Sequence, residues 1–195
     1  MNVLLLGSGG REHAMAWSIA KSDRFDKLFN APGNPGTAQV GTNIELDLSN
    51  FEAILTFIEE NEVSLTIVGP EKPLVDGITD FLEEKGHKVF GPSKVAAQLE
   101  GSKKFANEFM KENRIPTADF QTYGRDEFDK ALKVIKSKDE YPVVLKADGL
   151  AGGKGVFICE SAEEVEKRLH ELKADERFED AAQKLVVEEF LRGDE

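Results

Sequence analysis

Short apolar runs alternate with amphipathic segments through the first half of the chain, and this alternation constrains the fold more than any other feature. NVLLL, KLFNA, SLTIV and KVF are typical of buried strands, and segments with helical spacing separate them. In NFEAILTFIEENE the apolar residues recur at i, i+3, i+4 and i+7, namely Phe51, Ile54, Leu55 and Ile58. This order predicts an α/β fold with a doubly wound, Rossmann-like parallel sheet.

Three local predictions follow the same patterns. We expect IELDL to form a further strand, between KLFNA and the helix NFEAILTFIEENE. The helix after GSGG should turn Ala14, Trp17 and either Ile19 or Ala20 toward the sheet. After the loop GPEKP, the segment LVDGITDFLEEKG should form a single helix that Gly86 closes.

Ligands of such sheets bind in the loops that follow the strands, which here are GSGG, APGN, GPE and GPS. Gly9 and Gly10 open a helix and offer backbone amides to a phosphate, and Arg11 in the first turn would add a positive charge. Glu71 would accept hydrogen bonds from a sugar or an amine. The alternatives are a surface arginine and a turn that caps the next helix.

A nicotinamide oxidoreductase is disfavoured by two positions. Glu12 stands where the dinucleotide motif G-x-G-x-x-G requires its third glycine. The second strand ends in Asn30, where an NAD site places an acidic residue for the ribose. A phosphorylated metabolite at the same amides stays open.

After residue 101 the strands PVVLKA and GVFIC flank a glycine-rich stretch as in a hairpin, and a helix follows them. We therefore divide the chain into domains 1–101 and 102–195, with an α+β second domain. Because the sequence stops just after the strand KLVVEEFL, we expect this second domain to be truncated.

The stretch KADGLAGGKGV carries more glycine than a plain hairpin needs: Gly149, Gly152, Gly153 and Gly155, with Lys154 among them. Lys146 ends an apolar strand, where a buried ammonium needs an anion. Lys103 begins a helix, where the dipole disfavours cations. A bound polyphosphate would compensate both, so we favour a phosphate-binding flap over a structural hairpin. It is not a Walker A motif, because G-x-x-x-x-G-K-[ST] is absent.

The last segment, VVEEFLRGDE, predicts an edge strand, and the free backbone of such an edge at Glu188, Glu189, Phe190 and Leu191 can read an adenine. Glu195 would then take two ribose hydroxyls. Taken alone, however, the segment favours an ordinary edge strand with solvated acidic side chains.

Composition limits the partners. The formal net charge is −12, with an acidic excess in both halves, which argues against a nucleic-acid surface. Cys159 is the single cysteine, interpreted as a buried strand residue instead of a catalytic thiol, and a reducing cytoplasm suits it. No apolar run approaches the about 18 residues of a membrane span. We expect a cytoplasmic monomer that binds small molecules.

Seven segments together resemble the N-terminal half of the phosphoribosylamine–glycine ligase (glycinamide ribonucleotide synthetase) family of ATP-grasp enzymes. They are MNVLLLGSGGREHAMAW, NAPGNPGT, LTIVGPEKPLVDGI, VFGPSKVAAQLEGSKKFANEFM, IPTADF, VVLKADGLAGGKGV and VVEEFLRGDE. The resemblance covers the whole chain in order, and GSGGREHA with KADGLAGGKGV is highly specific. Gly152 departs from the alanine usual in the family, which loosens the flap and changes no functional group.

The resemblance implies a substrate-binding domain over 1–101 and the first part of an ATP-grasp domain, with its small lid, over 102–195. It implies that ATP phosphorylates glycine and that 5-phosphoribosylamine attacks the acyl phosphate, in de novo purine biosynthesis. Lys103, Lys146 and the glycine loop would hold the ATP phosphates, the backbone at Glu189 and Leu191 the adenine, and Glu195 the ribose. Phosphoribosylamine would face Gly9, Gly10, Arg11 and Glu71.

The family's chain is longer than this one, and the resemblance places the ligands of its Mg²⁺ or Mn²⁺ beyond residue 195. We assign no catalytic residue within 1–195 and expect the isolated chain to be inactive. Two alternatives stay open: a non-catalytic nucleotide-binding module, and another ATP-grasp carboxylate–amine ligase.

Overall fold

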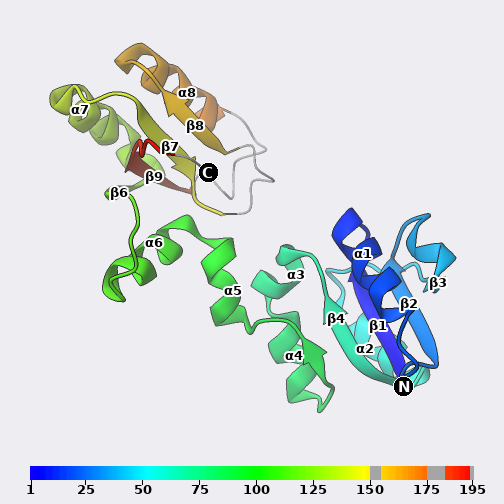
Figure 1. The fold of residues 1–195 in the computed structure, drawn as a ribbon. Helices are drawn as coiled ribbons and strands as arrows, with labels where there is room; N and C mark the ends of the chain where they lie inside the picture. The colour runs from blue at the N-terminus through cyan, green and yellow to red at the C-terminus, as the bar shows by residue number, and fades with distance from the viewer. Residues whose placement is uncertain (150–154, 175–182, 194–195) are drawn as a thin grey trace. The chain divides into compact units, whose positions relative to one another are not determined.

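A computed structural model describes residues 1–149, 155–174 and 183–193 (Figure 1). The chain separates into two compact units, Met1–Ala97 and Gln98–Glu195. The first contains a parallel five-stranded sheet and the second an antiparallel four-stranded sheet, each packed with helices. The predicted α/β class, with a Rossmann-like sheet followed by an α+β part, is confirmed.

All strand pairs in the first unit are parallel, in the order β3-β2-β1-β4-β5. The strands are β1 (Asn2–Gly7), β2 (Lys27–Pro32), β3 (Thr42–Asn43), β4 (Val63–Val68) and β5 (Val89–Phe90). The chain winds outward from β1 to β2 and β3, then returns to place β4 on the other side of β1. The order therefore reverses between β1 and β4, and ligands of such sheets bind at this switch point.

Helices cover both faces of this sheet. Successive residues of β1 point to opposite sides, so both faces are apolar and both are covered. Val3 and Leu5 pack with α1, and Leu4 and Leu6 pack with the helices of the other face. The helical segments are α1 (Gly10–Ile19), η1 (Thr37–Gln39), α2 (Phe51–Glu60), α3 (Glu71–Asp76), α4 (Ile78–Glu84) and α5 (Lys94–Gly101). None of the helices in the described ranges is long and apolar enough to cross a membrane.

The predicted inner face of α1 is wrong in part. Ala16 is fully buried, and Met15 and Ile19 pack around it. Ala14 and Trp17, in contrast, are exposed, Trp17 to 55%, and the Lys21 ammonium lies 3.0 Å from the Trp17 ring centroid. The helix is oriented by Glu12 and Ala16, its two buried residues, which lie one turn apart. Hydrophobicity alone misplaced the tryptophan.

Two further predictions need correction. IELDL forms no strand, since β3 is only Thr42–Asn43, although Ile44, Leu46 and Leu48 still pack against the core. The single helix expected over 74–86 is two helices, α3 and α4, separated at Gly77. Gly77 has φ +104°, a left-handed conformation that interrupts the helix. Gly86, with φ +85°, follows α4 as predicted.

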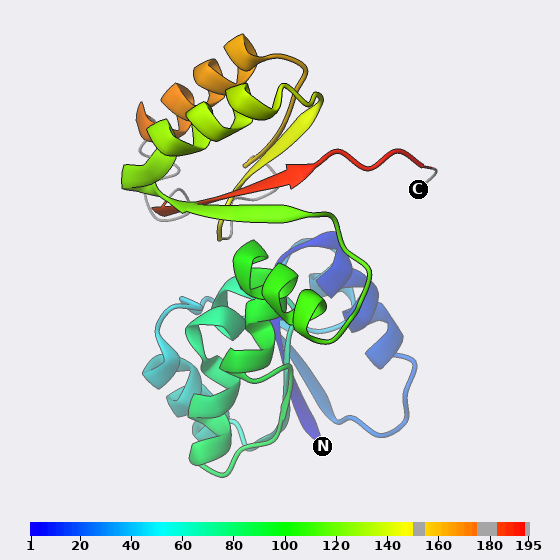
Figure 2. The same cartoon turned by 90° about the vertical axis from the view of Figure 1, so that its left-hand side faces the viewer.

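The second unit contains a sheet in the order β6-β9-β7-β8, with all pairs antiparallel. Helices α7 and α8 lie side by side over one face of this sheet, as Figures 1 and 2 show, and enclose a core around Phe128, Leu145 and Leu172. The elements are α6 (Lys103–Glu112), β6 (Phe120–Gly124), η2 (Arg125–Glu127), α7 (Phe128–Lys138), β7 (Val143–Ala147), β8 (Val156–Cys159), α8 (Ala162–Ala174) and β9 (Lys184–Glu189).

The prediction that the last strand is an edge strand is wrong. β9 lies between β6 and β7 and pairs with both. The β7–β8 hairpin leaves one side of β7 open, and β9 fills it after the chain returns through α8. The backbone groups of β9 are therefore engaged in the sheet up to Glu189.

Replacing Ile58 in α2 by alanine should strongly destabilise the first unit. Its side chain is 1% exposed, and removing such a side chain typically costs about 2–5 kcal/mol of unfolding free energy. Glu60→Ala, on the exposed side of the same helix, should change it by less than about 0.5 kcal/mol. Urea unfolding followed by the fluorescence of the single tryptophan, Trp17, measures both. Similar losses for the two variants would contradict the observed packing of α2.

Candidate functional site

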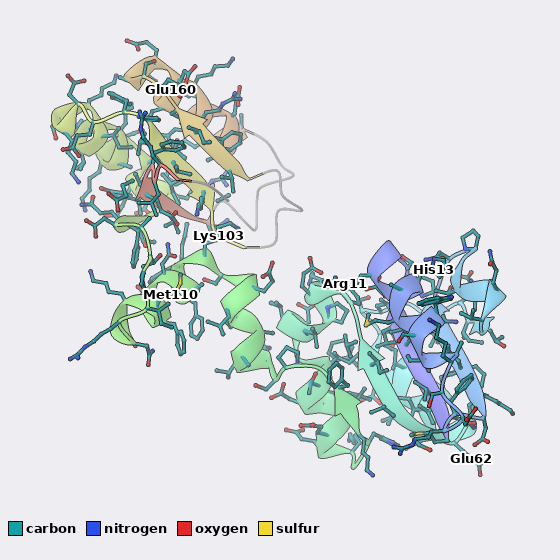
Figure 3. All side chains as sticks on the ribbon, in the orientation of Figure 1. Arg11, His13, Glu62, Lys103, Met110 and Glu160 are labelled. Carbon is teal, nitrogen blue, oxygen red and sulfur yellow. The ribbon has the colours of Figure 1, made fainter. Side chains whose placement is uncertain are left out.

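Two lysines in the second unit lie near the start of the glycine-rich stretch. Lys103 is the first residue of α6 (Figure 3), and its Nζ donates to the Gly149 carbonyl at 3.0 Å. Lys146 lies near the end of β7, and its Nζ pairs with Glu188 Oε2 at 2.5 Å. Both ammonium groups are thus held by partners from the ends of neighbouring elements.

Asp148 fastens the end of β7 to the start of α6. Ser102 Oγ donates to its two carboxylate oxygens at 3.0 and 3.1 Å, and the Lys104 amide donates to Oδ1 at 3.1 Å. Ser102 also caps α6, because its Oγ accepts from the Phe105 amide. A carboxylate at this helix terminus offsets the two lysines of the first turn, which the helix dipole disfavours.

The charge on Lys103 is not fully compensated. Burial lowers the pKa of its ammonium below the ordinary value. The nearby Asp148 carboxylate opposes this shift, while the like charge of Lys146 lowers the pKa further. Lys103 and Lys146 are therefore close enough to repel each other. An anion that contacts both would relieve the repulsion and favour the charged lysine.

Glu188 is buried and uses its two carboxylate oxygens separately. Oε1 accepts from Asn107 Nδ2 at 2.7 Å, and Oε2 pairs with Lys146. Asn107 comes from α6, Glu188 from β9 and Lys146 from β7. The cluster thus joins one helix and two adjacent strands, on the face of the sheet opposite α7 and α8.

The chain leaves the sheet after Glu189. The backbone amide of Glu189 donates to the Asp119 carbonyl at 3.0 Å. The side-chain Oε1 of Glu189 accepts from the Asp119 amide at 3.0 Å. Phe190 and Leu191 follow outside the strand, and Leu191 is 62% exposed.

Part of the predicted phosphate loop and the predicted ribose ligand lie outside the described residues, namely Gly152, Gly153, Lys154 and Glu195. Gly149 and Gly155 lie at the two ends of the loop. Gly149 accepts from Lys103, and the Gly155 carbonyl accepts from the Ala147 amide at 2.8 Å.

In the first unit, the switch point between β1 and β4 is occupied by a buried carboxylate. Glu12 is 4% exposed; its Oε2 accepts from the Gly9 amide at 2.6 Å and its Oε1 from Arg11 Nε at 3.2 Å. Arg11 Nη2 in turn donates to Glu71 Oε2 at 3.4 Å, which brings together the loops after the two strands. Arg11 and Glu71 remain exposed at the surface of this network.

Three glycines make room for Glu12. A Cβ at Gly69 would lie 2.3 Å from Glu12 Oε1, one at Gly9 would lie 2.9 Å from Oε2, and one at Gly7 would lie 2.6 Å from Cγ. Gly7 and Gly9 of GSGG therefore accommodate a carboxylate of the protein itself. Sequence reasoning treated Glu12 only as a missing glycine, and it did not foresee that Gly9 donates its amide to this residue.

Asn34 ties the loop after β2 to the loop after β1, and the sequence analysis did not single it out. Its Nδ2 donates to the carbonyls of Ser8 and Gly9 at 2.9 and 3.1 Å. Its Oδ1 accepts from the amides of Gly36 and Thr37 at 2.7 and 3.0 Å. One side chain thus fixes the shape of both loops at the carboxyl end of the sheet.

Two family models together match the whole chain. A sequence model of the phosphoribosylglycinamide synthetase N domain matches residues 1–100, and the model of the ATP-grasp (A) domain of that synthetase matches residues 101–195. The chain belongs to the phosphoribosylglycinamide synthetase family. The resemblance that the sequence motifs indicated is therefore confirmed.

Relatives in this family match the chain throughout. The phosphoribosylamine–glycine ligase of Clostridium acetobutylicum is 46% identical over 193 residues, which cover 99% of this chain and 46% of that protein. The crystal structure of phosphoribosylamine–glycine ligase from Thermotoga maritima is 38% identical with a TM-score of 0.77, over 100% of this chain and 45% of that one. This chain thus spans less than half the length of these relatives.

A more distant structure shares the fold alone. N5-carboxyaminoimidazole ribonucleotide synthetase from Thermotoga maritima is 22% identical with a TM-score of 0.70, and the match covers 97% of this chain and 46% of that one. The fold therefore extends beyond the phosphoribosylglycinamide synthetase family.

Substituting Gly69 should reveal the space that Glu12 occupies. Gly69→Ala should lower the unfolding free energy by about 1–3 kcal/mol, because the new methyl group forces the buried carboxylate to move. Gly10→Ala is the matched control, since its Cβ would meet no atom within 4 Å and alanine favours the helix by up to about 1 kcal/mol. Urea unfolding measures both, and a neutral Gly69→Ala would contradict the crowding around Glu12.

Cys159 should be unreactive in the folded family member. It is fully buried in β8, and burial raises the pKa of its thiol to about 11, with the Glu164 carboxylate adding to the effect. Because the thiolate is the reactive form, a thiol reagent at mildly alkaline pH should label Cys159 orders of magnitude more slowly than it labels the guanidinium-unfolded chain. Comparable labelling rates would show that the thiol is accessible and ionised, and would favour a catalytic role for Cys159.

Proposed function

We propose that the second unit binds ATP and that the chain contributes ATP and amine-substrate binding to a phosphoribosylamine–glycine ligase. The family membership supports the reaction class. The observation that carries the proposal is the lysine pair: the Lys103 ammonium contacts the first glycine of the loop, and Lys146 lies near the end of the strand that leads into it. Burial, and to a smaller extent the like charge of Lys146, lower the pKa of Lys103.

The lysines suit the phosphates of ATP. Each ammonium has three donors, and among the described residues the Gly149 carbonyl contacts Lys103 and Glu188 pairs with Lys146. Phosphate oxygens would accept hydrogen bonds from the remaining N–H donors of the two ammonium groups. Gly149, Gly152, Gly153, Lys154 and Gly155 are proposed to complete the phosphate site with backbone amides and a third cation.

The adenosine part is proposed to bind along the end of β9. Glu188 and Glu189 end the strand, and Phe190 and Leu191 continue outside the sheet. The internal position of β9 moves the proposed adenine contact from a strand edge to the backbone that follows the strand. Glu195 is proposed to hold the ribose.

In the first unit, 5-phosphoribosylamine is proposed to bind at the switch point, against Gly9, Gly10, Arg11 and Glu71. The Gly9 amide already serves Glu12, so the proposed phosphate contacts are the Gly10 amide in the first turn of α1 and the exposed Arg11 guanidinium. Space next to Gly10 is open, because a Cβ there would meet nothing within 4 Å. Glu71 would accept hydrogen bonds from the sugar or the amine.

The proposed chemistry has two steps. A glycine carboxylate oxygen attacks the γ-phosphorus of ATP, and ADP leaves. The amine of 5-phosphoribosylamine then attacks the acyl carbon, phosphate leaves, and the amine loses a proton. Lys103 and Lys146 would neutralise charge on the phosphates during the first step, which is the main catalytic contribution in phosphoryl transfer.

Divalent metal ions assist most phosphoryl transfers. Within residues 1–149, 155–174 and 183–193, no group of three His, Cys, Asp or Glu side chains is placed to hold one. The roles proposed for the described residues are binding and charge neutralisation.

Removing Lys146 should weaken ATP binding. Lys146→Ala should raise the Kd about tenfold or more, because a hydrogen bond to a charged group contributes about 1.5–3 kcal/mol. Lys167→Ala, on the exposed side of α8, removes the same charge from the chain and should leave the Kd unchanged. Isothermal titration calorimetry with ATP measures both variants. Equal effects would contradict the phosphate site, as would an unsubstituted chain that binds no ATP.

A further inference from the structure

Asn107 is a buried polar residue to which the proposed ATP site assigns no role. It lies in α6, is 6% exposed, and donates from Nδ2 to Glu188 Oε1 at 2.7 Å. The two residues are 81 positions apart in the chain. A buried carboxamide that bonds a buried carboxylate from a distant part of the chain fixes the orientation of that carboxylate.

The orientation of Glu188 decides what Lys146 can reach. A free carboxylate can offer both oxygens to one ammonium. Here Oε1 accepts from Asn107, and Lys146 pairs with Oε2. The ammonium is therefore held at one side of the carboxylate, and its remaining donors are left for other acceptors.

The same hydrogen bond joins the elements that carry the two lysines. Lys103 and Asn107 are four residues apart in α6, a spacing that places both on the same side of the helix. Lys146 and Glu188 lie on the adjacent strands β7 and β9. The bond from Asn107 to Glu188 thus fastens the helix of one lysine to the sheet of the other.

We propose that Asn107 is a positioning residue for nucleotide phosphates: through Glu188 it orients the Lys146 ammonium and keeps it in register with Lys103. This inference rests on the proposed ATP site. Asn107 itself touches no ligand. The competing explanation is that Asn107 only satisfies a buried carboxylate, which would change stability without a specific effect on Lys146.

A double-mutant cycle in ATP affinity separates the two explanations. Asn107→Leu keeps a similar volume and removes the donor, so Glu188 turns both oxygens to Lys146; we expect a Kd about tenfold higher. Combined with Lys146→Met, the loss should be well below the product of the two single losses, because both changes remove one function. A full product would overturn the proposal. Asn113→Leu is the control, because Asn113 is exposed at the end of α6 and its side chain donates to the Phe109 carbonyl of the same helix.

A second measurement needs no nucleotide. An amine held by a carboxylate acylates slowly, so the rate at which acetic anhydride modifies Lys146, read by peptide mass spectrometry, reports on its pairing. In Asn107→Leu both oxygens of Glu188 are free to hold Lys146, so acylation of Lys146 should become several-fold slower. In Asn113→Leu the acylation rate should stay unchanged. An unchanged rate in Asn107→Leu would overturn the proposal. If the unsubstituted chain binds no ATP, the proposed function fails, and this rate still decides whether Asn107 positions Lys146.

Asn107→Asp covers the case in which the leucine variant does not fold. It has the same shape and replaces the donor by a second acceptor, which competes with Glu188 for Lys146. We expect weaker ATP binding and a changed Lys146 acylation rate in this variant too. If Asn107→Asp shows the affinity and the acylation rate of the unsubstituted chain, Asn107 does not position Lys146.

Discussion

Each unit is organised around a buried carboxylate at the ends of its strands. Glu12 and Glu188 are 4% and 6% exposed, and a buried carboxylate is costly unless hydrogen bonds and a cation compensate it. Glu12 takes the Gly9 amide and Arg11; Glu188 takes Asn107 and Lys146. Loops, helix starts and strand ends must therefore meet at these points, and the candidate sites form around them.

These acids also explain how a chain with a net charge of −12 holds positive charge where an anionic substrate would need it. Arg11 is held between Glu12 and Glu71, and Lys146 is held by Glu188. Each carboxylate contacts its cation through one oxygen, so Arg11 and Lys146 keep further donors. Local pairing of this kind positions a cation without a basic surface, which fits small phosphorylated ligands better than a nucleic acid.

The sequence predicted the fold where the signal is local. Period and turn residues located β1, β2, β4 and β5 of the first sheet, the helix around Ile54 and Ile58, and the β7–β8 hairpin. It failed where tertiary contacts decide. The inner face of α1 follows the burial of Glu12, which no hydrophobicity pattern records, and the internal position of β9 depends on pairing with β6 and β7. Gly77 was visible in the sequence, but its left-handed conformation was not.

The candidate site shows the same division. Lys103, Lys146 and the glycine loop stand out because their residue types are unfavourable in their local positions. Ser102 was detectable as a helix cap. Asn107 was not, because its meaning depends on Glu188, 81 positions away.

The partners of the two lysines in the structure are also the groups with which a phosphate would compete. Lys103 donates to the Gly149 carbonyl and Lys146 pairs with Glu188. A ligand must displace or share these contacts, so it gains only the difference between phosphate and the existing partners. Burial and mutual repulsion already disfavour the charged form of Lys103, so a shared phosphate would remove a cost that the protein alone bears. On this argument the lysine pair lowers the stability of the unliganded unit, while Asp148 and Asn107 keep the pair in place.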